Sequence, residues 1–413
     1  MQGSRNRNQH SEAGNNTICA KKGGCGQASG HATTATRPPT SSFARALWNF
    51  SSQWFLIPQG TGILAVILHQ LDYQFRGLPT ISVIVWVYTI VLLVIGLFLY
   101  TLRILLYRRH VAHMLRTSII ETSCLASIPI TLTTIIQMTA LVLVRQWGAA
   151  WGIVAYVLWW INTAMAVVVV MGIPYVFVKI QSPGVKAVLP GVLLPLISAL
   201  TSAAGGGVIC RYGALGSRLQ VPVIIVSFLE VGLGLTLAIT LTDIFMTRLF
   251  DQSFPAVEEI YQDMILCGPF GQASFALQIL GQAVLRGAFA DYDRGTFLTA
   301  EAAKPIGFAS ELAGLLVWGY GTFWWCFAIL SISHALISRV RHRQQISFTL
   351  AAWSLVFPWG VYTNAAVGLG KLMDSPAFKV WSTALLIILL VVWIVNHYFT
   401  VKGLVTGDLL GLR

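Results

Sequence analysis

The sequence predicts an all-α polytopic membrane protein of ten transmembrane helices, and three observations lead to that prediction. Hydrophobic residues make up 56% of the 413 positions. Charged residues make up only 10%, against roughly a quarter in an ordinary soluble domain. Long uncharged runs alternate with short charged segments, and each run can cross a hydrocarbon layer of about 30 Å. Because so few charges cannot cover a soluble protein of this size, we expect lipid to cover most of the exterior.

Ten uncharged runs in chain order are the predicted spans. Their approximate limits are residues 54–71, 81–102, 122–144, 146–178, 187–210, 219–246, 264–285, 312–338, 344–370 and 380–401. These spans define a ten-helix domain over residues 51–402, with a short cytoplasmic C-terminal tail over residues 403–413. Residues 1–50 are predicted to be a disordered cytoplasmic tail, because they are polar and lack the apolar segment of a secretory signal.

The basic residues predict the orientation. The net charge is +12, and it is spread over the segments between the apolar runs, which is typical of topology-setting loops and not of a nucleic-acid surface. On the predicted topology, 18 of the 27 Lys and Arg residues lie on the side of the N-terminus and nine on the other. We therefore predict a multi-pass protein of the plasma membrane with both termini cytoplasmic.

The polar residues give no sign of an enzyme. The six cysteines and eight histidines lack the spacing of a zinc site or a redox motif. Gly205-Gly206-Gly207 is not followed by the Gly-Lys-Ser/Thr of a phosphate-binding loop. We expect no catalytic residues, metal, cofactor or nucleic-acid partner. Glu230 in the sixth span is an intramembrane carboxyl group, for which structural pairing is favoured over a role in proton coupling.

Every odd-numbered span carries a proline inside it. These residues are Pro58, Pro129, Pro195, Pro269 and Pro358. An interior proline removes a backbone hydrogen bond and kinks a helix, and in lipid the freed carbonyl needs a neighbouring group or water. This alternation predicts five helical hairpins, in which the kinked first helices line a central pore and the second helices face lipid.

Small, hydroxyl and amide residues accompany the five prolines and are the candidates for lining this pore. They are Gly60, Thr61, Gly62, Ser127, Thr131, Ser198, Thr201, Ser202, Gly271, Gln272 and Asn364. Small residues alone more often indicate close helix packing. A pore is favoured because the kinked, polar spans alternate strictly with the other spans. Since no charged residue lies near the kinks, an anion in this path would be held by hydroxyls, amides, helix dipoles and free N–H groups.

Three segments resemble the fungal sulfite efflux pumps. The first is residues 54–75, with Gly60-Thr61-Gly62, and the second is Cys267-Gly268-Pro269-Phe270-Gly271-Gln272. The third is residues 353–358, ending in Phe357-Pro358, together with the following loop at 374–378. From about residue 50 onward the chain is similar to the tellurite-resistance/dicarboxylate transporter family, which also contains the slow anion channels of plant guard cells and the malate permease of yeasts.

This resemblance implies ten helices in five hairpins, homotrimers with one pore in each subunit, and a ninth-span phenylalanine that plugs the pore. The last role carries over to Phe357, whose alternative is an ordinary packed aromatic. Pro58-Gln59-Gly60 departs from the Met-Gly expected before Thr61, so the polarity of the pore could differ there.

The implied function is transport of a small inorganic or organic anion across the bilayer, with sulfite efflux first. The alternatives are a malate or C4-dicarboxylate permease and a voltage-dependent anion channel-like protein. A receptor-like regulatory membrane protein is less favoured, because nothing in the chain resembles a ligand-binding domain.

Overall fold

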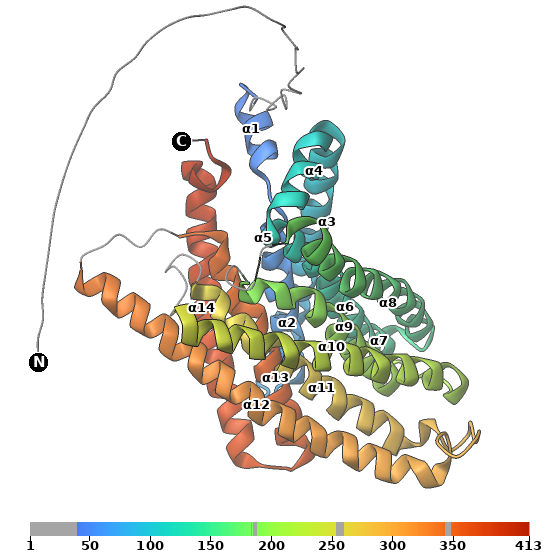
Figure 1. Cartoon of the computed structure of the whole chain (residues 1–413). Coiled ribbons are helices and arrows are strands. Elements are labelled where there is room, and N and C mark those ends of the chain that lie inside the picture. Colours follow the sequence, from blue (N-terminus) through green and yellow to red (C-terminus); the bar gives the residue numbers. More distant parts are fainter. Residues whose placement is uncertain (1–38, 183, 185–187, 253–259, 343–347, 413) are drawn as a thin grey trace, which may run out of the picture. The chain divides into compact units, whose positions relative to one another are not determined.

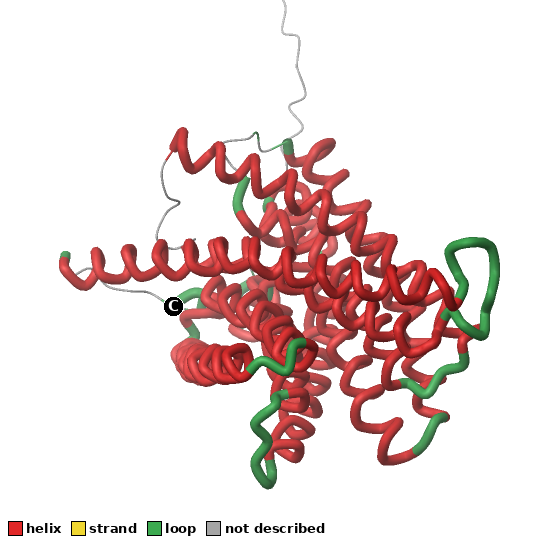
Figure 2. The backbone as a smooth tube through the Cα atoms, turned by 90° about the horizontal axis from the view of Figure 1, so that it is seen from below, coloured by secondary structure: helices red, strands yellow, loops and turns green. Residues whose placement is uncertain are grey.

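Helices joined by loops make up the structure, a computed structural model that describes residues 39–182, 184, 188–252, 260–342 and 348–412. All of these residues belong to one compact unit. Apart from an isolated bridge between Arg294 and Leu298, the described residues form no strand (Figures 1 and 2). The predicted all-α class is therefore confirmed for this part of the chain.

Eight helical segments of the described chain are long and apolar enough to cross a membrane. They are Leu78–Leu106 (α3), Ile119–Trp147 (α5 to α7), Ala150–Gln181 (α8 and its π-helical end), Pro190–Tyr212 (η6 and α9), Ser217–Asp251 (most of α10), Ile260–Ala288 (η7, α11 and η8), Ala300–Arg341 (α12) and Pro376–Thr406 (α14). Their length and hydropathy identify a polytopic membrane protein.

Two shorter helices correspond to the first and ninth predicted spans. Helix α2 covers Leu56–Gln70 and helix α13 covers Val356–Leu372, with 15 and 17 residues. Each continues directly from a 3₁₀ segment, η1 (Ser52–Phe55) or η9 (Leu350–Leu355). Their α-helical parts are short because each segment begins as 3₁₀ helix.

All five proline-bearing segments share this construction. In each, a 3₁₀ segment leads into an α-helix whose second or third residue is the proline. The pairs are η1 with α2, η2 (Cys124–Ala126) with α6 (Ser127–Met138), η6 (Pro190–Leu193) with α9 (Leu194–Tyr212), η7 (Ile260–Cys267) with α11 (Gly268–Ala283), and η9 with α13. The first turn of an α-helix tolerates proline, because the N–H that proline lacks would have no partner within the helix there. The proline thus stands where the 3₁₀ lead-in becomes α-helical.

These five helices form a closed ring, which we call the inner ring. Helix α2 contacts α6, α6 contacts α9, α9 contacts α11, α11 contacts α13, and α13 contacts α2. In the apolar stretches that contain α6, α9 and α11, between 78% and 100% of the residues are buried, against 22% to 39% in those of the other five long segments. The inner ring is therefore the core of the molecule.

The remaining long helices cover the inner ring. Helices α3, α8 (Ala150–Val176), α10 (Ser217–Gln252), α12 and α14 pack against α2, α6, α9, α11 and α13, respectively. Each presents exposed aliphatic side chains: Leu105, Val168, Leu229, Leu330 and Val405 are 67% to 83% exposed. So large an apolar exterior is typical of a protein that is surrounded by lipid.

The N-terminal tail predicted over residues 1–50 was too long, because Ser42–Asn49 forms helix α1. Trp48 stacks on His110 with ring centroids 3.8 Å apart, and its carbonyl accepts a hydrogen bond from Arg103 Nε at 3.2 Å. These partners lie 55 or more residues further along the chain. Residues 1–38 of the predicted tail lie outside the described residues.

The C-terminal tail predicted from residue 403 also begins too early. Helix α14 continues to Thr406, and a short 3₁₀ segment, Asp408–Leu410, follows it. The carbonyl of Leu410 accepts a hydrogen bond from Asn49 Nδ2 at 2.9 Å. The two predicted tails are thus partly ordered because they contact each other and α3.

Candidate functional site

A narrow cavity lies at the lead-in end of the inner ring. Its volume is about 20 Å³, and it is lined by residues from all five lead-in regions, including Gln53, Cys124, Gly191, Gln262 and Ser354. We call it the lead-in pocket. The N-termini of the five inner α-helices lie at this end, so their partial positive charges are directed toward the pocket.

Two wider cavities lie where the inner helices end. They measure about 320 and 470 Å³, and both are lined by Arg211 and Lys371. His69, Arg145 and Arg286 line one or the other, so that all five inner segments contribute a side chain. We call these two neighbouring cavities together the C-terminal vestibule. The inner ring therefore has a cavity at each end.

One face of each inner helix runs from the lead-in pocket to the C-terminal vestibule. On α13 this face begins at Ser354 in the pocket, passes Phe357, Val361 and Asn364, and ends at Lys371 in the vestibule. The other four inner helices, with the segments that continue them, have corresponding faces. These faces carry, on α2, Leu56, Gln59, Ile63, Val66 and Gln70; on α6, Ser123, Ser127, Ile130, Thr134, Gln137 and Leu141; on α9, Leu194, Ser198, Thr201, Ala204, Val208 and Arg211; and on α11, Ile265, Gly268, Gln272, Phe275, Ile279 and Gln282. Steps of three or four residues keep such positions on one side of a helix. We call these the inner faces.

Several buried polar groups on the inner faces have no hydrogen-bond partner among the described residues. Both amide atoms of Gln59 and of Asn364 lack one, as do the Ser127 hydroxyl and the side-chain carbonyls of Gln137 and Gln272. All five side chains are at most 2% exposed. A buried polar group without a partner is costly, so these groups can accept a polar ligand at little further desolvation cost.

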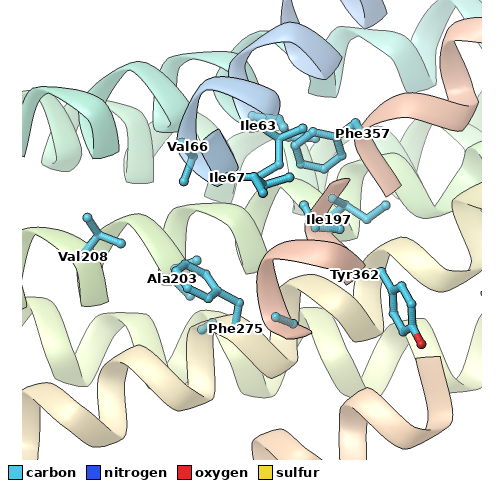
Figure 3. Packing of buried hydrophobic residues seen from close by; sticks show 14 of the residues in the cluster. Ile63, Val66, Ile67, Ile197, Ala203, Val208, Phe275, Phe357 and Tyr362 are labelled. Atoms are coloured by element: carbon cyan, nitrogen blue, oxygen red, sulfur yellow. The ribbon is translucent and has the colours of Figure 1, made fainter. Parts of the chain in front are cut away.

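The surroundings of Phe357 are apolar. Its side chain is 2% exposed, and in Figure 3 it points toward Ile63 and Ile67 of α2, with Ile197 of α9 nearby. Pro358 follows directly, at the start of α13. Phe357 thus lies between the polar groups near the lead-in pocket and those near the vestibule, in a belt of aliphatic side chains.

The three predicted pore-lining glycines all lie at contacts between helices. A Cβ atom on Gly60 would lie 2.9 Å from Val356 of α13, one on Gly62 2.1 Å from the Thr134 hydroxyl of α6, and one on Gly271 2.7 Å from the backbone of Tyr362. Real Cβ contacts are longer, so each glycine permits a close helix crossing. Helix packing accounts for all three.

Two predicted hydroxyl residues, Thr61 and Ser202, have partners on outer helices. Thr61 accepts a hydrogen bond from Trp393 Nε1 of α14 at 3.1 Å. Ser202 pairs with Thr163 of α8 at 2.7 Å, close to Glu230 of α10. Thr131 donates to the Ser127 carbonyl within its own helix at 2.7 Å, and its position, four residues after Ser127 and three before Thr134, borders the inner face of α6. By contrast, the remaining candidates have the spacing of the inner faces: Ser127, Ser198, Thr201, Gln272, Asn364 and Phe357.

The Gly271 contact gives a stability prediction. Gly271→Ala is expected to destabilise the protein by about 1–3 kcal/mol, because the added methyl group meets backbone atoms that cannot rotate away. Gly232→Ala on α10 is the matched control, since a Cβ there meets nothing within 4 Å and alanine favours a helix. Thermal unfolding in detergent would show a lower Tm for Gly271→Ala alone. Equal Tm values for both variants and the wild type would contradict the close crossing.

These features define a polytopic membrane protein built around a ring of buried helices with a cavity at each end. Residues 49–401 match the family described as voltage-dependent anion channel. The chain belongs to that family, and the resemblance seen in its sequence motifs is confirmed.

Among its relatives is a sulfite efflux pump of Arthroderma benhamiae, 28% identical over 364 residues, which span 88% of this chain and 93% of the pump. The malic acid transport protein of Schizosaccharomyces pombe is 23% identical over 90% of this chain and 82% of its own length. An uncharacterised transporter of Methanocaldococcus jannaschii is 21% identical over 87% of this chain and 96% of its own length. No group of three or more His, Cys, Asp or Glu residues that could hold a metal occurs in the described part of the chain.

Proposed function

We propose that this chain exports sulfite, or a closely related small oxyanion, across the plasma membrane through its inner ring. Membership of an anion channel family makes anion transport the activity, and relatives named sulfite efflux pumps support the choice of anion. The observation that carries the proposal is the pair of cavities joined by the inner faces and interrupted by one aromatic side chain, Phe357.

Ten spans in five hairpins fit this path. A 3₁₀ segment rises about 2.0 Å per residue and an α-helix about 1.5 Å. With their lead-ins, α2 and α13 therefore extend about 30 and 38 Å, enough to cross the hydrocarbon layer. Residues 51–402 would then be the transport domain. With both termini cytoplasmic, the lead-in pocket opens to the cytoplasm and the C-terminal vestibule to the outside.

The inner faces hold an anion weakly. Between the lead-in pocket and the vestibule they carry hydroxyl and amide groups but no charged side chain in the described residues. Hydroxyls, amide N–H groups and the positive ends of five helices stabilise an anion without trapping it. Such a path passes small anions quickly and discriminates modestly between them.

The size of the lead-in pocket favours a small anion over a dicarboxylate. A volume of about 20 Å³ is room for about one water molecule, so a four-carbon diacid would have to widen it considerably. Malate transport remains the second candidate, because a malic acid transport protein aligns over 90% of the chain. The family resemblance also supports a homotrimer, in which each subunit has its own path.

Anion uptake into liposomes tests this proposal. Purified protein is reconstituted, and the uptake of sulfite, malate, nitrate and chloride is compared at two pH gradients. We expect sulfite to move faster than malate, with smaller differences among the small anions. Malate uptake faster than sulfite uptake would favour the dicarboxylate permease, and no uptake of any anion would refute the proposal.

The amide of Asn364 gives a more local prediction. Asn364→Leu keeps the size of the side chain and removes an unpartnered amide from the inner face. One net hydrogen bond is worth about 1 kcal/mol, so we expect flux to fall roughly fivefold. Thr236→Val on outer helix α10, whose hydroxyl donates to the Gly232 carbonyl within its own helix, is the control and should leave flux nearly unchanged. If Thr236→Val reduced flux as much as Asn364→Leu, the inner faces would be assigned wrongly.

A further inference from the structure

Each of the five inner segments ends on a basic side chain. The last turns carry His69 on α2, Arg145 on α7 (Val144–Trp147), Arg211 on α9, Arg286 on η8 (Val284–Ala288) and Lys371 on α13. All five side chains line the C-terminal vestibule. Three arginines, a lysine and a histidine therefore meet around one mouth of the ring.

Arg211 is the centre of this cluster. It lines both cavities of the vestibule, and its guanidinium lies 5.1 Å from the centre of the Tyr212 ring. Its Nε and Nη1 atoms are buried and have no hydrogen-bond acceptor among the described residues. A guanidinium offers its N–H groups as a planar fork that matches two oxygens of an oxyanion. The cavity beside Arg211 is where such an anion fits.

Little negative charge offsets these cations. Lys371 Nζ donates a hydrogen bond to the Gln70 carbonyl, and Asp72 is the carboxylate that interacts with it electrostatically. Basic residues in a last turn also stabilise the helix end, which explains one cation per helix. It does not explain the buried N–H groups of Arg211 that lack an acceptor. The vestibule as a whole keeps an excess of positive charge.

We propose that the C-terminal vestibule is a binding site for a small oxyanion, separate from the weak sites on the inner faces and centred on Arg211 and Lys371. The role given to this site rests on the proposed function, because the vestibule is one mouth of the path. An anion that has passed Phe357 is collected there before release. An oxyanion bound from outside occupies the same position and slows further exit.

Binding of inorganic sulfate to the purified full-length protein tests the site directly. Isothermal titration at low and at high ionic strength should show binding that weakens with salt, because the cavity is open to solvent. Arg211→Gln should weaken sulfate binding about tenfold, the loss expected for a charge-assisted hydrogen bond. Arg211→Lys, which keeps the charge, should lose less affinity for sulfate. Arg218→Gln is the matched control, because Arg218 is exposed near this end but does not line the vestibule.

Two results would overturn the proposal: no sulfate binding by the wild type at low ionic strength, or equal binding by Arg211→Gln and Arg218→Gln. Sulfite flux in liposomes separates this site from the proposed function. If the proposed function fails, no sulfite moves, yet sulfate binding still depends on Arg211. If the vestibule site fails, sulfite moves, and sulfate on the vestibule side inhibits the wild type no more than Arg211→Gln.

Discussion

Phe357→Ala is expected to raise passive anion flux by about tenfold or more. An aromatic ring in a narrow path is a hydrophobic barrier to an ion, and lowering a barrier by only about 1.4 kcal/mol gives a factor of ten. The ring is 2% exposed and lies in an aliphatic belt between two polar zones. A rotation of its side chain, beside the proline in the first turn of α13, is a low-cost opening motion. Flux in liposomes of the wild type and the variant measures the effect.

The alternative role of Phe357, a packed core residue, predicts a different result. Truncating a buried phenylalanine costs roughly 3–5 kcal/mol and lowers the folded yield without opening a path. Phe270→Ala is the matched control, because Phe270 is 1% exposed on inner helix α11 but its ring meets Tyr320 of α12 edge-on at 4.5 Å. We expect Phe270→Ala to lose stability and gain no flux. Well-folded Phe357→Ala protein with wild-type flux would defeat the gate.

Glu121→Ala is expected to destabilise the protein by about 3–5 kcal/mol, because it leaves a buried cation without its partner. Glu121 and Arg103 are 3% and 2% exposed and form an ion pair at 2.5 Å. The same carboxylate accepts hydrogen bonds from the Ser52 backbone N–H at 3.1 Å and from the Tyr100 hydroxyl at 3.2 Å. This network joins α3, α5 (Ile119–Ser123) and η1 next to the lead-in pocket. The folded yield and Tm in detergent would both fall.

A double variant provides the control for this ion pair. Replacing both partners, as Arg103→Met with Glu121→Leu, removes the unpaired charge and can be nearly neutral in a buried site. We expect it to recover most of the stability lost in Glu121→Ala. If Glu121→Ala is as stable as the wild type, or if the double variant is less stable than Glu121→Ala, the ion pair does not hold these helices together.

The class of the fold could be predicted from composition and apolar runs, whereas the orientation of each helix about its axis could not. Gln59 and Thr61 are two residues apart, or about 200° around a helix. One lies on the inner face and the other meets Trp393 of α14. Which of them faces the ring depends on the neighbouring helices. For this reason the predicted set included Thr61 and missed Gln59 and Gln137.

Two other features escaped prediction for different reasons. Helix α1 lies within a polar segment, and its order depends on Arg103 and Leu410, which are distant in sequence. The basic vestibule did have a signal, since every odd-numbered span ends near a basic residue. When these basic residues are treated only as loop charges, they predict the orientation of the protein in the membrane and nothing more. Their common position at the ends of five helices that form a ring is what indicates a site.

The central claim is that anions pass along the inner faces, and chemical modification of a single inner-face cysteine tests it most directly. Asn364→Cys is introduced in a background from which the native cysteines have been removed. It lies between Phe357 and the vestibule, so a negatively charged thiol reagent can reach it from that side. Leu229→Cys, at a position 67% exposed on outer helix α10, is the control. We predict that labelling stops sulfite flux in Asn364→Cys and leaves it intact in Leu229→Cys, and undiminished flux through fully labelled Asn364→Cys would contradict the claim.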